Sequence, residues 1–312
     1  MRLLIKSGGE EAMAEWRAHF QAVNPLIDVR FWADPAVAPE TVDYVMAWEP
    51  PAGWLAGLPN LKVVFSSGAG VDHITKDPAW PRQLPLIRMG GDDLSQRMGE
   101  YIVWSALSLL RDTRDFALGQ DAAEWRYKEV PFSAADRTVG IMGMGNLGVR
   151  AAEMLQGVGF PVRGWSRSPK TVPGVEDFAG PEALEAFLAG TDILVCLLPS
   201  TPDTADIIDA ALLARLPKGA HVINAGRGPH VVEADLIAAL DSGHIAGAVL
   251  DVFRAEPLSA DSQLWRHPRI TVTPHIASTP TRRGKVEFVA NCIAAFEAGK
   301  PLPNVFDPVR GY

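Results

Sequence analysis

Short apolar runs alternate with amphipathic stretches along the chain, at spacings typical of strands and helices that follow one another. In the first hundred residues the apolar runs predict strands at 3–5, 27–31, 44–47 and 63–65. A helical pattern at 11–20 lies between the first two strands, and another at 99–110 leads out of this region. Residues 113–127 are expected to form an arm. The alternation predicts a flavodoxin-like α/β layer in the first part of the chain.

The apolar runs of the second half are more nearly continuous. They predict strands at 138–142, 161–166, 192–198, 220–224, 247–252 and 269–273. Continuous hydrophobicity of this kind is typical of strands that are buried on both faces of a parallel sheet. A final helical pattern at 285–298 is expected to return the chain to its first half.

Glycines recur in the pattern G-x-G-x-x-G at Gly143, Gly145 and Gly148, where the first of these later strands passes into a helical pattern. In a dinucleotide site, the first glycine allows the tight turn, the second lets the backbone approach a pyrophosphate, and the third lets the helix pack on the sheet. The same spacing also arises for purely structural reasons in a chain with 28 glycines. The preceding strand and the βαβ spacing that follows favour the dinucleotide site.

The position of this motif near the middle of the chain predicts a nested architecture. A dinucleotide-binding fold normally carries the motif near its start, so the residues ahead of it imply a separate structure. We expect an α/β protein with two doubly wound parallel-sheet domains. In this prediction, a Rossmann cofactor domain of residues 98–284 is inserted into a flavodoxin-like substrate domain formed by residues 1–97 and 285–312.

Composition narrows the classes of function. The 312 residues are enough for two domains, and 47% of them are hydrophobic. A formal net charge of −8 and the lack of a basic run argue against a nucleic-acid partner. Cys196 and Cys292 lie in apolar surroundings and are expected to be core residues. No apolar run has the length of a signal peptide or membrane span, so we expect no membrane partner and a cytoplasmic location.

Four segments beyond the glycine motif, 224–228, 250–253, 255–258 and 273–277, lie at or just past predicted strand ends, where open α/β sheets place ligands. With these segments in this order, the chain resembles the D-isomer-specific 2-hydroxyacid dehydrogenases over essentially its whole length. Several stretches resemble the bacterial glyoxylate/hydroxypyruvate reductase A subfamily more narrowly, namely 68–72, 165–167, 230–233, 264–268 and 310–312.

The side chains of these segments suit the reduction of a 2-keto acid. The reaction needs a proton donor for the oxyanion that hydride transfer creates, and His275 is the natural candidate. The resemblance assigns Glu256 as the carboxylate that orients this imidazole and favours its protonated form. Arg227 offers a planar, permanently charged fork for the substrate carboxylate. Taken singly, each residue also reads as an ordinary loop or surface position. No His or Cys cluster has metal-ligand spacing, so no metal is expected.

The end of the second strand of the cofactor domain indicates which nicotinamide is bound. An NAD-specific site usually carries Asp or Glu there, whereas residues 165–170 contain no carboxylate. Arg167, with the hydroxyls of Ser166 and Ser168 and the ammonium of Lys170, suits a 2′-phosphate. We therefore expect NADPH to be preferred over NADH. Alternatively, Arg167 stacks on the adenine and either cofactor binds.

The resemblance implies further cofactor contacts. The glycine loop contributes Gly143, Met144, Gly145, Asn146, Leu147 and Gly148. The other contacts are Trp165, Leu198, Pro199, Thr204, Ala225, Gly226, Asp251 and Ala277. For Asp251 the alternative is an ordinary strand-end turn former.

On the substrate side, the resemblance implies that Ala69 and Gly70 bind the substrate carboxylate together with Arg227, next to His275. Trp48 is a candidate pocket wall, or alternatively a partly buried core aromatic. A homodimer is expected, in which Trp125 of the arm reaches the partner subunit's pocket. Two other functions stay open: a family member with another side-chain preference, or a nicotinamide-sensing protein like the family's corepressor branch.

Overall fold

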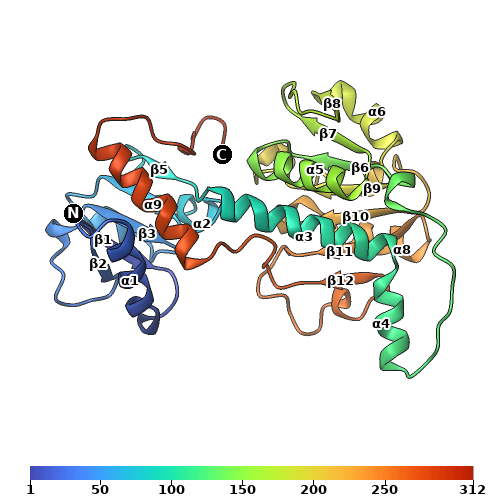
Figure 1. The fold of residues 1–312 in the computed structure, drawn as a ribbon, viewed down its shortest axis with the longest axis horizontal. Helices are drawn as coiled ribbons and strands as arrows, with labels where there is room; N and C mark the ends of the chain where they lie inside the picture. Colours follow the sequence, from blue (N-terminus) through green and yellow to red (C-terminus); the bar gives the residue numbers. More distant parts are fainter. Residues whose placement is uncertain (312) are drawn as a thin grey trace. The chain divides into compact units, whose positions relative to one another are not determined.

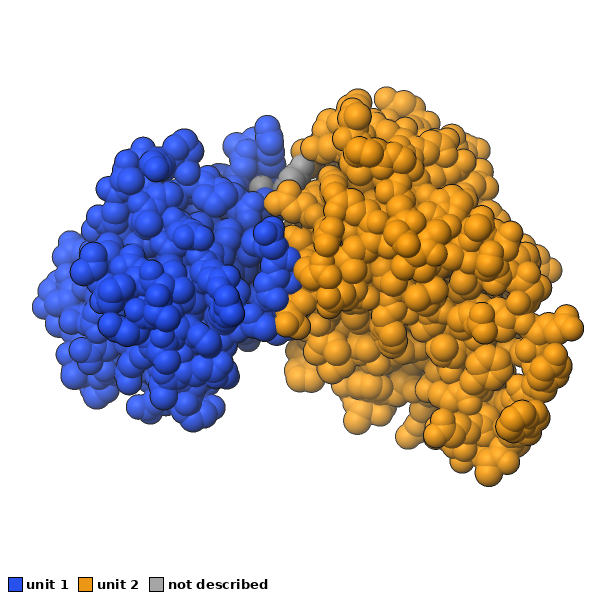
Figure 2. All heavy atoms as spheres, in the orientation of Figure 1, with its two compact units in different colours: residues 1–94, 279–312 blue, residues 95–278 orange. Residues whose placement is uncertain are grey.

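The computed structural model describes residues 1–311 and forms two compact units (Figures 1 and 2). Unit 1 comprises Met1–Leu94 and the chain from Thr279 onward, and unit 2 comprises Ser95–Ser278. The sequence places the domain boundaries at 97/98 and 284/285, a few residues further along the chain than the division between the units. Tyr312, the last residue of the 310–312 stretch, lies outside the described residues.

Unit 1 is built on a five-stranded parallel sheet with the strand order β2-β1-β3-β4-β5. Its strands are β1 (Arg2–Lys6), β2 (Asp28–Phe31), β3 (Tyr44–Ala47), β4 (Val63–Ser66) and β5 (Leu86–Ile87). The order is that of flavodoxin-like folds, which confirms the predicted layer. The sequence pattern missed β5, because two residues are too few to form a detectable apolar run.

The helices of unit 1 come from both ends of the chain. They are α1 (Met13–Val23), the short α2 (Asp72–Thr75) and α9 (Arg282–Glu297). Helix α1, whose buried side chains are Met13, Trp16 and Phe20, packs against α9. At the start of α9, the Thr281 hydroxyl accepts the Gly284 N–H at 3.0 Å, which supplies a partner for one otherwise unpaired helix donor. The last segment of the chain therefore completes the first unit.

Unit 2 contains a seven-stranded parallel sheet with the order β12-β11-β10-β9-β6-β7-β8. Its strands are β6 (Val139–Met142), β7 (Val162–Ser166), β8 (Val175–Ala179), β9 (Ile193–Cys196), β10 (Ala220–Asn224), β11 (Ile245–Leu250) and β12 (Ile270–Val272). The direction of winding reverses at β6, which pairs with both β7 and β9. This is the dinucleotide-binding topology, with its ligand crevice expected at the reversal.

The edge strand β8 was not predicted. It carries the exposed Glu176 and Asp177 in the middle of five residues, so it lacks the apolar run that marks the other strands. An edge strand tolerates such charges, because one side of it faces no neighbouring strand and charge there discourages unwanted pairing.

Helices cover both faces of the unit 2 sheet. The helices of the unit are α3 (Asp92–Leu110), α4 (Thr113–Asp121), α5 (Asn146–Val158), α6 (Leu184–Ala189), α7 (Ala210–Leu213) and α8 (Glu233–Asp241), and all but α4 contribute to the two apolar clusters of the sheet. Along β9, Ile193 and Val195 pack in the apolar cluster that includes α3 and α5 residues. Leu194 and Cys196 pack in the cluster that includes α6, α7 and α8 residues. Burial on both faces explains the unbroken apolar runs seen in the sequence.

Two predicted elements differ from the structure. Helix α3 begins at Asp92 rather than at 99, because its polar first turns carry Asp92 and Asp93, which suit a helix N-terminus but do not show in an apolar pattern. The predicted arm at 113–127 starts as helix α4, and residues 124–133 then have no regular secondary structure. Among the described residues, no helix combines the length and apolarity needed to cross a membrane.

Candidate active site

The candidate residues of unit 2 lie on loops that follow parallel strands. The glycine loop follows β6, the Leu198 loop follows β9, the Arg227 loop follows β10, and the His275 loop follows β12. Because parallel strands end at one edge of the sheet, these loops share that edge, as expected for a doubly wound fold.

The three motif glycines have different surroundings. Gly143 has a φ of +108°, and a Cβ on it would lie 2.7 Å from the Leu197 carbonyl oxygen. A Cβ on Gly148 would lie 2.1 Å from the Gly143 carbonyl oxygen, so helix α5 approaches the end of β6 too closely for any side chain. A Cβ on Gly145 would meet nothing within 4 Å. The helix N-terminus thus opens onto space above Gly145, which fits the pyrophosphate of a dinucleotide.

The residues after β7 present positive charge. Arg167, Ser168 and Lys170 are exposed, whereas the Ser166 hydroxyl donates to the Ser168 carbonyl at 2.7 Å and shapes the turn. The carboxylate of Asp177 accepts the backbone N–H of Lys170 at 3.0 Å. Upstream, the indole of Trp165 donates to the Gly180 carbonyl at 2.8 Å. A 2′-phosphate would meet a guanidinium and an ammonium at this turn.

His275 and Glu256 form a close pair. The imidazole Nδ1 lies 2.6 Å from Glu256 Oε2, and about a third of each side chain is exposed. The second carboxylate oxygen, Oε1, accepts the backbone N–H of Phe253 at 2.9 Å. Glu256 is therefore held by the backbone and in turn fixes the orientation of the imidazole.

The loop that carries His275 is organised by Asp251, which is 1% exposed. The Asp251 carbonyl oxygen accepts the His275 N–H at 2.8 Å. Its carboxylate accepts the N–H groups of Ile276 and Ala277 at 2.9 and 2.8 Å. These bonds hold His275 at a φ of +54°, a left-handed conformation that is unusual for a residue with a side chain.

A hydroxyl chain reaches the same carboxylate. The Thr273 hydroxyl donates to Asp251 Oδ1 at 2.6 Å, and the Tyr101 hydroxyl lies 2.7 Å from Thr273 Oγ1. Because threonine has one hydroxyl proton, Tyr101 must donate to Thr273. Burial, together with the negative charge of Asp251, raises the pKa of the Tyr101 phenol, which keeps it protonated. Helix α3 is thereby connected to the His275 loop.

The backbone around Arg227 is fixed by polar contacts. Its carbonyl accepts the Asn224 amide at 3.0 Å, and its N–H donates to His230 Nδ1 at 3.1 Å. The guanidinium Nη1 donates to the Gly226 carbonyl at 2.7 Å, and the side chain is partly buried. The Arg227 backbone is thus held by two neighbouring side chains, and its guanidinium is bonded to the Gly226 carbonyl.

The loop after β9 is tied to the same region. The Thr204 hydroxyl donates to the Pro199 carbonyl at 2.7 Å, and this carbonyl lies 3.1 Å from His230 Nε2. Leu198 is buried, and Pro199 is partly buried.

The other predicted cofactor contacts differ in accessibility. Met144 is buried and packs in the apolar cluster beneath α5, so only its backbone faces the glycine turn, while Asn146 is exposed and Leu147 is partly buried. Ala225, Gly226 and Ala277 are buried.

In unit 1, the loop after β4 is organised by Ser66. Its Oγ lies 2.8 Å from the Gly68 carbonyl oxygen and 2.6 Å from that of Gly70. In a trans peptide the N–H points opposite to the C=O, so the N–H groups of Ala69 and Val71 turn away from Ser66. Outward N–H groups of this kind suit a carboxylate. Of the two residues predicted to bind the substrate carboxylate, Ala69 and Gly70, this geometry turns the N–H of Ala69 outward, together with that of Val71.

Trp48, at the end of β3, packs over this loop. Its ring stacks on His73 with a centroid distance of 4.2 Å, and it is 37% exposed. A Cβ on Gly68 would lie 3.0 Å from the indole. The partly exposed Trp48 ring thus packs against one side of the loop after β4.

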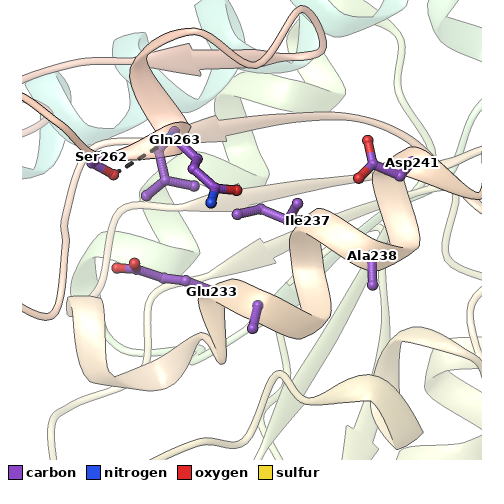
Figure 3. A pocket seen from close by; sticks show the side chains of 8 residues that line it. Glu233, Ile237, Ala238, Asp241, Ser262 and Gln263 are labelled. Carbon is purple, nitrogen blue, oxygen red and sulfur yellow. Dashed lines mark hydrogen bonds between the residues drawn. The ribbon is translucent and has the colours of Figure 1, made fainter.

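A groove elsewhere in unit 2 contains none of the predicted site residues. It has a volume of about 440 Å³ and lies between α8 and the 3-10 turn Gln263–Trp265 (Figure 3), lined by Glu233, Ala234, Ile237, Ala238, Asp241, Ser262, Gln263 and Leu264. Within residues 1–311, no group of three or more His, Cys, Asp or Glu side chains is arranged to hold a metal ion.

Comparison with known proteins defines the class. Residues 103–277, more than half of the chain, match the family model of the D-isomer specific 2-hydroxyacid dehydrogenase NAD binding domain. A D-isomer specific 2-hydroxyacid dehydrogenase from Xanthobacter autotrophicus Py2, solved with NADPH and MES, is 43% identical, with a TM-score of 0.93 over 100% of this chain and 99% of that chain.

Two further solved structures match over the same extent. An NADPH-dependent glyoxylate/hydroxypyruvate reductase from Sinorhizobium meliloti, solved with NADP and sulfate, is 42% identical, with a TM-score of 0.90 over 100% of this chain and 99% of that chain. A probable 2-hydroxyacid dehydrogenase from Rhizobium etli CFN 42, solved with NADP, HEPES and L(+)-tartaric acid, is 38% identical, with a TM-score of 0.89 over 100% and 99%.

The chain therefore belongs to the D-isomer specific 2-hydroxyacid dehydrogenase family, and the resemblance inferred from the motifs is confirmed. It is an NAD(P)-dependent D-2-hydroxyacid dehydrogenase.

The different surroundings of the motif glycines predict different mutant behaviour. Gly145→Ala is expected to leave the thermal unfolding midpoint nearly unchanged, because the new Cβ meets no atom within 4 Å, but to weaken NADPH binding at least about tenfold by obstructing the pyrophosphate. Gly148→Ala is expected to lower the unfolding midpoint, because its Cβ would lie 2.1 Å from a carbonyl oxygen. Thermal unfolding and NADPH fluorescence titration measure the two effects.

Gly157→Ala provides a matched control in the same helix. Its Cβ also meets nothing within 4 Å, and alanine is expected to stabilise the helix by roughly 1 kcal/mol with no effect on NADPH. Wild-type NADPH affinity in Gly145→Ala would show that the space above this glycine does not hold the cofactor.

Proposed function

We propose that this enzyme reduces small 2-keto acids of the glyoxylate and hydroxypyruvate class, with NADPH as the preferred cofactor. The observation that carries the proposal is the His275–Glu256 pair, fixed at 2.6 Å on the sheet edge that also carries Arg227 and the glycine loop. The 42% identical protein from Sinorhizobium meliloti, named an NADPH-dependent glyoxylate/hydroxypyruvate reductase, supports this substrate class.

His275 supplies the proton. When bound, NADPH provides a hydride for the carbonyl carbon, and the carbonyl oxygen then takes a proton to give the 2-hydroxy acid. Because Nδ1 is engaged by Glu256, we assign the transfer to Nε2 of His275. The Glu256 carboxylate stabilises the imidazolium before transfer and holds the ring orientation. Asp251 acts indirectly, by holding the backbone of the loop that carries His275.

Arg227 binds the substrate carboxylate. Its guanidinium gives a charge-assisted, planar contact that also polarises the adjacent carbonyl. The loop after Ser66, at the predicted residues Ala69 and Gly70, provides the second set of donors, among them the outward N–H of Ala69. Trp48 restricts the side chain of the substrate to a small group.

Replacement of His275 tests the mechanism. His275→Ala is expected to lower kcat for glyoxylate by about 10²–10⁴-fold, the usual contribution of a positioned acid, while the dissociation constant for NADPH stays unchanged. Glu256→Gln is expected to cause a smaller loss, because the amide retains the hydrogen bond but not the charge. Steady-state kinetics and fluorescence titration give both quantities.

A second imidazole–carboxylate pair in unit 2 supplies the control. His267 Nε2 lies 3.3 Å from Asp241 Oδ1, away from the predicted site loops. His267→Gln and Asp241→Asn are expected to retain wild-type kcat. Near-wild-type turnover in His275→Ala would contradict the assignment of the proton donor.

The turn after β7 favours the phosphorylated cofactor. Arg167, Ser168 and Lys170 are exposed there, and the nearby Asp177 carboxylate is engaged by a backbone N–H. A carboxylate in the position of Arg167 would repel a 2′-phosphate, whereas a guanidinium forms short charge-assisted bonds with it. The similar proteins solved with NADPH or NADP support the same preference.

Kinetics with both cofactors test substrate and cofactor together. We expect kcat/KM to be higher with NADPH than with NADH on glyoxylate and hydroxypyruvate, and lower for bulkier 2-keto acids. Arg167→Ala is expected to lower kcat/KM for NADPH by about 10–100-fold, the value of one to two charge-assisted bonds, and to leave that for NADH within about twofold. A wild-type preference for NADH would refute the cofactor proposal, and no turnover of any 2-keto acid would refute the substrate proposal.

The arm after α4 is the proposed contact with a second copy of the chain. Arg126 and Lys128 each lie 3.0 Å from the Asp115 carboxylate, so ion pairs hold the start of the arm on α4. Trp125 precedes Arg126, and Tyr127 lies between Arg126 and Lys128. Their side chains are 95% and 79% exposed. Large aromatic side chains displayed on an ordered segment are typical of protein interfaces.

Trp125→Ala is accordingly expected to shift the protein from dimer toward monomer in sedimentation velocity, since an interface aromatic contributes about 2 kcal/mol or more. Leu26→Ala, which removes a side chain that is 73% exposed in unit 1, is the control and is expected to leave the sedimentation coefficient unchanged. A wild-type protein that sediments as an active monomer would exclude the dimer.

A further inference from the structure

His230 is completely buried and lies directly after the Arg227 loop, at the end of the 3-10 turn Gly228–His230. It belongs to the 230–233 stretch that resembles the reductase subfamily, yet neither the catalytic assignment nor the cofactor assignment uses it. Both of its ring nitrogens contact backbone groups. Nδ1 lies 3.1 Å from the Arg227 nitrogen, and Nε2 lies 3.1 Å from the Pro199 carbonyl oxygen.

The chemistry of these partners fixes the protonation of the ring. A backbone N–H can only donate, so Nδ1 must accept, and a carbonyl can only accept, so Nε2 must carry the proton. His230 is therefore a neutral imidazole in the Nε2–H form. Burial, with a smaller contribution from the Arg227 charge, lowers the pKa of His230 and is consistent with this form.

The other groups around the ring are compatible with a neutral imidazole. The Cys196 sulfur lies 3.5 Å from Nδ1, and burial raises the pKa of its thiol to about 12, so it carries no charge. A Cβ on Gly226 would lie 3.1 Å from Nδ1 and 3.1 Å from the Leu198 carbonyl oxygen. The imidazole thus lies between two loops that approach each other closely at Gly226.

We propose that His230 is a positioning residue that sets the spacing between the loop of Arg227, the proposed carboxylate-binding residue, and the loop Leu198–Thr204, which the family resemblance assigns to cofactor binding. One ring nitrogen serves each loop: Nδ1 holds the Arg227 backbone, and Nε2–H holds the Pro199 carbonyl, to which Thr204 also donates. The proposal rests on the proposed roles of these two loops.

Two amide variants separate the functions of the two nitrogens. The Asn amide lies two bonds from Cβ, as Nδ1 does, so His230→Asn retains an acceptor for the Arg227 N–H and loses the bond to Pro199. The Gln amide lies three bonds from Cβ, as Nε2 does, so His230→Gln retains the donor to Pro199 and loses the acceptor for Arg227. Each variant therefore removes one bond while keeping the other.

We expect the two variants to raise different constants. His230→Gln is expected to raise the KM for the 2-keto acid about tenfold with the NADPH dissociation constant near wild type, as for the loss of one buried hydrogen bond. His230→Asn is expected to raise the NADPH dissociation constant about tenfold with the keto-acid KM near wild type. His230→Leu, which removes both bonds, is expected to raise both.

A merely structural role would not produce this separation. Equal changes of both constants in the Asn and Gln variants, or no change in either, would overturn the proposal. As a matched control, His244, whose Nε2 lies 2.9 Å from the Leu213 carbonyl oxygen in the same unit, is replaced by Leu. His244→Leu is expected to keep wild-type kinetic constants. The ¹⁵N chemical shifts of the His230 ring report the tautomer independently of activity, and a protonated Nδ1 at pH 7 would also overturn the proposal.

Failure of the proposed function is distinguishable from failure of this inference. Wild-type turnover of glyoxylate and hydroxypyruvate is measured first, and its absence would overturn the substrate class itself. An active wild type in which the His230 variants change both constants in parallel would overturn only the role of His230.

Discussion

A buried carboxylate at the end of β11 determines the geometry of the site. Asp251 is almost without solvent contact, and such a charge is stable only when hydrogen-bond donors surround it. Its donors are the Thr273 hydroxyl and the N–H groups of Ile276 and Ala277, all from the loop after β12. The conformation that the loop adopts supplies these donors. In that conformation His275 adopts its left-handed backbone and meets Glu256.

The sheet topology places these groups close together. Because β6, β9, β10, β11 and β12 are parallel, the loops that follow them share one edge, and each loop adds one kind of chemistry. The loops after β6, β10 and β12 carry the motif glycines, Arg227 and His275, respectively. The positions of these side chains are then refined by short contacts between neighbouring loops, of which the His230 bridge is one.

The sequence was sufficient to predict the fold class and the family. Strands buried on both faces leave long apolar runs, and the G-x-G-x-x-G spacing directly reflects a close approach that only glycine permits. Elements without such a signature were missed: β5 is two residues long, β8 carries exposed carboxylates, and the polar first turns of α3 have no apolar repeat.

The site could be predicted only in part, for a related reason. Residue types that carry chemistry, such as His275, Glu256 and Arg227, can be recognised from their motifs, and their pairing follows from the family pattern. The contacts that hold them in place cannot be recognised in this way. One of the two partners of His230, the Pro199 carbonyl, is 31 residues away in the sequence, and Tyr101 is separated from Thr273 by most of unit 2. Such contacts depend on which loops meet after the sheets form.

The return of the last segment to unit 1 also has a consequence for the order in which a newly made chain can fold. Helix α9 packs on α1, so this side of α1 stays uncovered until residues 282–297 have been made. Unit 2, by contrast, is continuous in sequence and emerges complete while synthesis continues. Although domains are usually expected to mature in the order of their N-termini, the nucleotide-binding half of this enzyme is the first whose residues are all made, and the apolar side of α1 needs protection until α9 arrives.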